Sequence, residues 1–139
     1  MEIEAAREFL RENHRGVLAT RRQNGDLQMT PVLVGVDADG RAIISSNEDR
    51  AKVANLRRDP AASVCVFTNR FFGDWVQLSG AAEVLSLPDA EEPLVDYYRR
   101  TAGEHPDWDE YRAAMHRDAS CLIRITLERA AGRPSSSDG

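Results

Sequence analysis

The sequence SSNEDRAKVANLRRDP, residues 45–60, separates the predicted strands into two groups, and the rest of the chain is interpreted around it. It follows the short apolar run RAIIS, which is typical of a strand, and its Asn47 and Asp49 are suited to cap a helix that begins near Arg50. A strand therefore leads directly into a helix. Because the first turn of a helix has unpaired backbone N–H groups and a positive dipole end, this junction is suited to bind an anion.

The side chains at this junction favour a phosphate group. Ser45 and Ser46 supply hydroxyls at the end of the strand, and Arg50 and Lys52 supply cations at the start of the helix. Of the 18 basic residues in the chain, Lys52 is the only lysine, which indicates a position that needs a compact ammonium rather than a planar guanidinium. The alternative interpretation is that these cations form the solvent-facing side of an ordinary amphipathic helix.

Six β-type runs precede and follow the predicted helix. The first two are joined at Asn24 and Gly25, a dipeptide suited to a tight hairpin. The long fifth run contains Gly80, which predicts a bulge or bend in that strand. The six runs are residues 16–22, 28–36, 41–46, 61–68, 75–86 and 120–132.

Three further helices are predicted outside these runs. Residues 2–13 form an amphipathic opening helix, residues 87–103 contain a second one that stops at Gly103, and residues 106–118 contain a third that opens at Asp107. Strands in hairpin order with few helices favour a mainly β fold, a small six-stranded antiparallel barrel with peripheral helices. We expect residues 1–133 to form one domain and residues 134–139 to be a disordered tail.

Composition restricts the function classes. The formal net charge of -5 argues against a general nucleic-acid-binding surface, and the apolar runs are much shorter than the roughly 20 residues of a membrane span. The chain has no secretory signal pattern, so we expect a cytoplasmic protein without membrane or nucleic-acid partners. Cys65 and Cys121 lie in apolar runs without CxxC spacing, which predicts buried free thiols.

Other catalytic motifs are missing from the sequence. The histidines have no partners at metal-ligand spacing, and neither GxGxxG nor GxxxxGK[ST] is present, so no metal site, classical dinucleotide fold or P-loop is predicted. Pro31 interrupts a predicted strand and leaves neighbouring backbone groups free. A flat heteroaromatic ring could bind edge-on there, and the alternative is an edge strand that tolerates a proline.

Several blocks together resemble the pyridoxamine 5′-phosphate oxidase-like, split-barrel flavin-binding family. They are GVLAT from Gly16, TPV from Thr30, SSNEDRAKVANLRRDPAASV from Ser45, GDW ending at Trp75, and AGEHPDWDEYRAAM from Ala102. The blocks are most similar to actinobacterial members that use the deazaflavin coenzyme F420. The resemblance implies a homodimeric split β-barrel that binds one cofactor at each end of the subunit interface.

The same resemblance assigns cofactor-binding roles at the strand-to-helix junction. Arg50 and Lys52 match the ligands of the cofactor phosphate, with Ser45 and Ser46 beside them, and Asn55 on the helix is a weaker candidate.

Two further segments match residues near the ring system. Thr30, Pro31 and Val32 resemble the backbone segment that faces the ring, and Trp75 and Gln77 lie on the strand that approaches from the neighbouring subunit in that family. The resemblance implies no side chain as a nucleophile, and no catalytic residue is predicted.

The implied function is an F420-dependent oxidoreductase that transfers hydride from reduced F420 to a small organic acceptor. An FMN-binding oxidoreductase of the same fold and a non-catalytic F420- or FMN-binding protein are the alternatives. Arg57 and Arg58 could serve the acidic tail of F420 or be plain surface residues. The chain ends without the Arg- and His-bearing motif of the pyridoxine-phosphate enzyme, so vitamin B6 oxidation is not expected.

Overall fold

A computed structural model describes residues 1–70 and 72–133 of the chain. The predicted tail, residues 134–139, lies outside this described part. The strands are β1 (Arg15–Arg21), β2 (Leu27–Leu33), β3 (Gly35–Val36), β4 (Ala42–Asn47), β5 (Ala61–Phe67), β6 (Trp75–Ser86) and β7 (Ser120–Arg133). The helices are α1 (Ile3–Glu12), α2 (Ala51–Arg58), α3 (Glu91–Ala102) and α4 (Trp108–Arg117).

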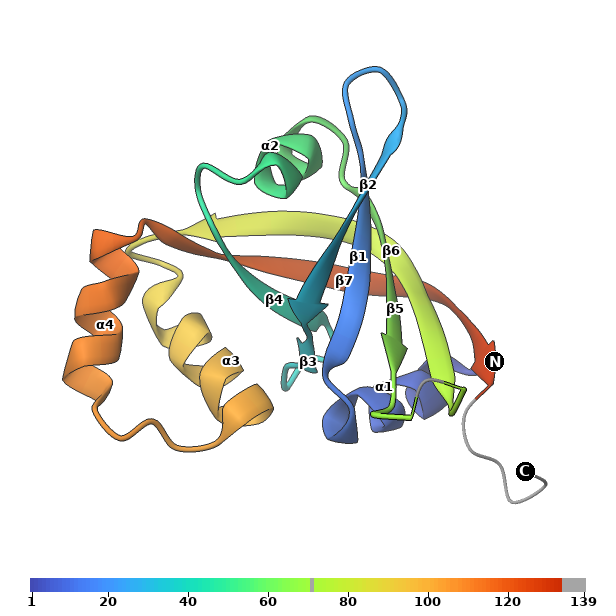
Figure 1. Ribbon diagram of the computed structural model, residues 1–139. Coiled ribbons are helices and arrows are strands. Elements are labelled where there is room, and N and C mark those ends of the chain that lie inside the picture. Colours follow the sequence, from blue (N-terminus) through green and yellow to red (C-terminus); the bar gives the residue numbers. More distant parts are fainter. Residues whose placement is uncertain (71, 134–139) are drawn as a thin grey trace.

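The strands form one curled antiparallel sheet, a half-barrel, in the order β2-β1-β5-β6-β7-β4-β3. Figure 1 shows α2 at one end of this half-barrel, α1 at the opposite end, and α3 and α4 together on one side. The mainly β architecture with peripheral helices is confirmed. None of the helices in the described residues is long and apolar enough to cross a membrane.

Within residues 1–70 and 72–133 the sheet has seven strands, so the prediction of six was wrong. The run at 28–36 breaks at Val34: β2 pairs with β1 at one edge of the sheet, whereas β3 pairs with β4 at the other. The Val34 N–H donates to the His14 carbonyl at 2.7 Å, and the His14 ring bonds the Val34 carbonyl at 2.9 Å. Because one residue joins two strands at opposite edges, the sheet must curl until those edges meet.

The predicted hairpin at Asn24 and Gly25 and the predicted bulge at Gly80 are both confirmed. Gly25 has a φ of 92° in the turn between β1 and β2, a conformation that side-chain-bearing residues rarely adopt. The pairing of β6 with β7 shifts register between Ser79 and Gly80. A Cβ at Gly80 would lie 1.8 Å from the Thr126 carbonyl oxygen, so this bulge requires glycine.

The main core fills the half-barrel because alternate residues of each strand point inward. Leu18, Val64 and Leu78 from three neighbouring strands are all buried there. Leu10 of α1 and Val53 of α2 belong to the same core cluster, so these helices close its two ends.

A smaller core joins α3 and α4 to the other side of β4 and β7. Ile43 and Leu122 point away from the half-barrel and pack with Leu94 and Met115 of the two helices. The predicted end of α3 and the predicted start of α4 are both confirmed. Helix α3 stops at Gly103, whose φ is 87°.

The Asp107 side chain caps α4 by accepting a hydrogen bond from the Glu110 N–H at 3.1 Å. Both cysteines are free thiols, with Cys121 buried and Cys65 only partly buried.

Candidate functional site

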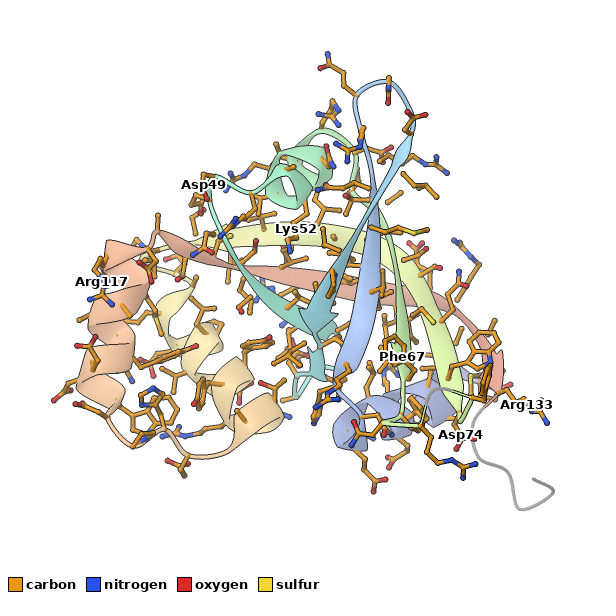
Figure 2. All side chains as sticks on the ribbon, viewed as in Figure 1. Asp49, Lys52, Phe67, Asp74, Arg117 and Arg133 are labelled. Atoms are coloured by element: carbon orange, nitrogen blue, oxygen red, sulfur yellow. The ribbon has the colours of Figure 1, made fainter. Side chains whose placement is uncertain are left out.

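A cavity of about 540 Å³ lies between β2 and β4 and reaches the start of α2. Figure 2 shows Asp49 and Lys52 at this start of the helix. The cavity is lined by Gln28, Thr30, Ser45, Ser46, Asn47, Asp49, Arg50, Ala51 and Lys52.

The cavity exists because the inward-facing residues become polar toward the α2 end of the half-barrel. On β2, Gln28 and Thr30 lie on the same face as Val32, which packs against the core. On β4, Ser46 follows the buried Ile44 on the same face. Since β2 and β4 are not neighbours in the sheet, no backbone ladder occupies the space between these polar side chains.

Two hydroxyl groups in the cavity need a partner. Among the described residues, the buried side-chain polar atoms that lack a hydrogen bond are Thr30 Oγ1 and Ser46 Oγ, and both residues line this cavity. Ser46 is only 9% exposed. An unpaired buried polar group costs about 1–3 kcal/mol, so a bound group with acceptor oxygens would stabilise both positions. A phosphate fits this requirement.

The start of α2 adds donors and positive charge. A helix supplies no acceptor for the N–H groups of its first turn, so those of Ala51 and Lys52 are suited to an anion in the cavity. The predicted capping by Asn47 and Asp49 was wrong, because Arg50 is the N-cap and makes no side-chain cap bond. Asn47 instead donates to the Asp118 carbonyl at 3.0 Å, which fixes the end of β4 to the loop after α4.

Lys52 is held partly buried at the cavity wall. Burial lowers the pKa of its ammonium group, and the nearby Arg50 lowers it further. A bound anion would oppose both effects. The interpretation of this helix face as merely solvated therefore does not describe Lys52, although Arg57 and Arg58 at the other end of α2 are exposed.

A carboxylate holds the loop before α2 in place. Glu48 accepts hydrogen bonds from Ser86 Oγ of β6 and from Arg57 Nη2, both at 2.6 Å. The hydrogen bond from Ser86, followed by that from Arg57, holds the pKa of the Glu48 carboxyl below its usual value, against the opposing effect of partial burial. Arg57 is thereby committed to a structural contact rather than being free for a ligand.

The structure brings together part of the predicted site. The predicted residues that line the cavity are Thr30, Ser45, Ser46, Arg50 and Lys52.

The other predicted site residues do not line the cavity. Asn55 is buried behind the cavity wall, and Val32 packs against the core. Pro31 is exposed on β2, which is an edge strand, as the alternative interpretation of this proline predicted. Trp75 and Gln77 lie on the outer face of the sheet, away from the inward-facing residues that line the cavity.

Gln28 is a cavity residue that the sequence interpretation missed. It lies two positions before Thr30, and residues two apart on a strand share a face, so the signal was present. Asn47 and Asp49, which were assigned to capping, also line the cavity.

A second hollow of about 650 Å³ lies on the outer face of β1, β2, β5 and β6. Its wall includes Val17, Met29, Cys65 and Gln77. Met29 is 63% exposed, although an apolar side chain of this size is usually buried. The helices lie at the two ends and on another side of the half-barrel (Figure 1).

Residues 3–133 match the family model described as pyridoxamine 5′-phosphate oxidase. Among solved structures, a conserved hypothetical protein from Mycobacterium tuberculosis is 23% identical with a TM-score of 0.77, and the match covers 100% of this chain and 92% of that one. A structure described as an F420 reductase is 18% identical with a TM-score of 0.69, covering 89% of this chain and 94% of that one.

A heme-binding protein from Mycobacterium smegmatis is 19% identical with a TM-score of 0.72. The match covers 97% of this chain and 55% of that protein. At these identities, the structural matches show a common fold.

Proposed function

This chain belongs to the pyridoxamine 5′-phosphate oxidase family, as its sequence blocks predicted, and we propose that it is an oxidoreductase that binds a flavin-type cofactor. The cofactor phosphate would occupy the cavity at the start of α2. We further propose that the cofactor is coenzyme F420 and that reduced F420 passes hydride to a small organic acceptor. The sequence blocks of F420-dependent members and the likeness in fold to a structure described as an F420 reductase support this choice.

The observation that carries the proposal is the pair of unpartnered hydroxyls in a cavity bordered by cations. Thr30 Oγ1 and Ser46 Oγ can donate to a phosphate, while Arg50 and Lys52 can neutralise its charge. The first turn of α2 adds backbone donors from the same side.

The residues of the chain hold and orient the cofactor. A bound deazaflavin or flavin supplies the hydride-transfer chemistry. Arg50 and Lys52 fix its phosphate end, and Thr30 and Ser46 define the position of that phosphate through hydrogen bonds. Hydride transfer requires donor and acceptor carbons about 3–3.5 Å apart, so rigid attachment at the phosphate helps to hold the ring in a reactive position.

We also propose that the protein works as a homodimer in the cytoplasm. The partly apolar outer hollow and the exposed Met29 support a subunit interface on that face. Trp75 and Gln77 would then reach the cofactor of the partner rather than that of their own chain. The free thiols of Cys65 and Cys121 fit a reducing compartment.

Titration of the protein with F420 and with FMN, followed by fluorescence, tests which of the two cofactors the protein binds. We expect tighter binding of F420, and then oxidation of reduced F420 when enone, imine or bilin-like acceptors are added. Tighter binding of FMN with turnover would instead identify an FMN oxidoreductase, and binding of either molecule without turnover would identify a cofactor-binding protein. If neither molecule binds, the proposed function is wrong.

A further inference from the structure

A line of hydrogen bonds runs from the surface of α2 to the cavity wall. It begins at Arg58, whose Nη2 donates to the Arg21 carbonyl and to Asn55 Oδ1, both at 2.9 Å. A guanidinium has only donors, so the atom of Asn55 that it contacts must be the amide oxygen. Arg58 therefore fixes which way the buried Asn55 amide points.

The orientation of Asn55 then determines that of its neighbours. Its NH2 group donates to Thr20 Oγ1 at 3.1 Å and to Gln28 Oε1 at 2.9 Å. Thr20 is 1% exposed and Asn55 is 6% exposed, so water cannot readily replace either partner. Because Asn55 presents donors, the Gln28 atom that faces it must be the amide oxygen.

Gln28 is the last member of this line, and it lines the cavity. Since its Oε1 is held by Asn55, its NH2 group is the part that is left for the cavity. Rotating the Gln28 amide by half a turn would place two NH2 groups against each other and break the bond to Asn55. The cavity wall thus carries the Gln28 NH2 group as a donor, and the direction of this donor is set by Asn55 and Arg58.

We infer that Gln28 is a fixed hydrogen-bond donor that selects the bound molecule, with Asn55 and Arg58 as its positioning residues. This inference rests on the proposed cofactor function of the same cavity. The group that meets Gln28 must be an acceptor, such as a phosphoryl oxygen, a ring carbonyl or an unprotonated ring nitrogen. A ligand that places an N–H at this position is disfavoured, because two donors would face each other.

Two substitutions at Gln28 test its role toward the ligand, with the dissociation constants of FMN and F420 as the readout. Gln28→Met removes the amide, and we expect affinity to fall about tenfold. Gln28→Glu retains an oxygen for Asn55 but replaces the NH2 group by a carboxylate oxygen, so the loss should be larger. Gln23→Met, in the exposed hairpin loop, is the matched control and should bind like the wild type. Unchanged affinity in Gln28→Glu would overturn the inference.

A double-mutant cycle tests the positioning role of Asn55. Asn55→Asp keeps the bond from Arg58 but removes the donor for Gln28, so affinity should fall in the Gln28 protein and stay unchanged in the Gln28→Met background. Equal losses in both backgrounds would show that Asn55 acts only on the fold. If Asn55→Asp does not fold, Arg58→Met at the exposed end of the line makes the same comparison.

Exchange of side-chain NH2 protons with solvent tests the orientation in the unliganded protein. The Asn55 NH2 should exchange slowly because it is buried and donates twice, whereas the Gln28 NH2 should exchange quickly until a ligand is added. Resonances are assigned by their loss in Asn55→Asp and Gln28→Glu. The opposite pattern would overturn the inference even if FMN or F420 binds. If neither molecule binds, the proposed function fails, while this measurement still decides how Gln28 is oriented.

Discussion

Lys52 lies partly buried at the cavity wall, where desolvation and the charge of Arg50 both lower the pKa of its ammonium group. The protonated form is therefore less favoured in the free protein than in water. A bound phosphate would reverse this balance by pairing with the charge. The chain uses arginine at its other basic positions, and a guanidinium would keep its charge in the same place without this sensitivity to pH.

We predict that Lys52→Ala weakens cofactor binding by about 1.5–3 kcal/mol, the range for a charge-assisted hydrogen bond. In the wild type, affinity should also fall as the pH rises through the lowered pKa of Lys52, because the neutral amine no longer attracts the phosphate. Lys52→Arg should lose this alkaline dependence, since its guanidinium remains protonated. The measurement is the dissociation constant by fluorescence titration from neutral to alkaline pH.

Arg117→Ala, on the exposed side of α4, serves as the control for removing one positive charge. It should leave both the affinity and its pH dependence unchanged. Wild-type affinity in Lys52→Ala would contradict the assignment of the phosphate to this cavity.

The loop that joins β4 to α2 is held in place by hydrogen bonds to other parts of the chain. Glu48 connects the junction loop to Ser86 on β6 and to Arg57 on the last turn of α2. Asn47 connects the end of β4 to the loop after α4. The start of the helix is therefore held at the cavity by Glu48, Ser86 and Arg57, which do not line it, and by Asn47, which does.

We predict that Glu48→Gln lowers the thermal unfolding midpoint at neutral pH, because Ser86 and Arg57 lose a charged acceptor. The folded protein holds the pKa of Glu48 below its usual value of 4.5. Such a group stabilises the fold above the unfolded-state pKa, and this stabilisation is lost as the pH falls through the folded-state pKa. The difference in midpoint between wild type and variant should therefore shrink as the pH falls below 4.5.

The measurement is thermal unfolding followed by circular dichroism at neutral pH and at a series of acid pH values. Glu12→Gln, at the exposed end of α1, is the control and should melt like the wild type throughout. A difference for Glu48→Gln that stays constant across the series would show that the carboxylate charge is not responsible.

At the scale of the whole molecule, the curled sheet has two unlike surfaces. Its inner surface is covered by the core and, toward α2, borders the polar cavity. Its outer surface carries exposed apolar side chains, with Leu27 51% and Met29 63% exposed on β2. Apolar groups that cluster in a surface hollow commonly mark a protein interface. A second copy of the chain is the occupant that would also bring Trp75 to the cofactor.

We predict that the protein is a homodimer in dilute solution and that Met29→Glu shifts it to a monomer, because the substitution would bury a charge in an apolar interface. Sedimentation velocity gives the mass of both forms. Ala113→Glu, on the exposed face of α4, is the control and should remain dimeric. A wild-type monomer that binds cofactor tightly would disprove the shared site.

The sequence by itself determined the features that depend on neighbouring residues. The hairpin at Asn24 and Gly25, the stop of α3 at Gly103, the cap of α4 at Asp107 and the bulge at Gly80 follow from local backbone preferences, and all four are present. The strand-to-helix junction and its hydroxyls and cations were found in the same way, because they lie within a few residues of one another.

Only the tertiary structure decided which of these groups meet and how they are oriented. The β-type run 28–36 is interrupted at Val34 because the chain crosses there between the two sheet edges. Asn47 bonds Asp118, 71 residues away, instead of capping its own helix. The Gln28 amide takes its orientation from Asn55, 27 residues further along the chain. Polar side chains choose among partners that the folded chain brings near, so their final bonds depend on packing between distant segments, which local sequence patterns do not specify.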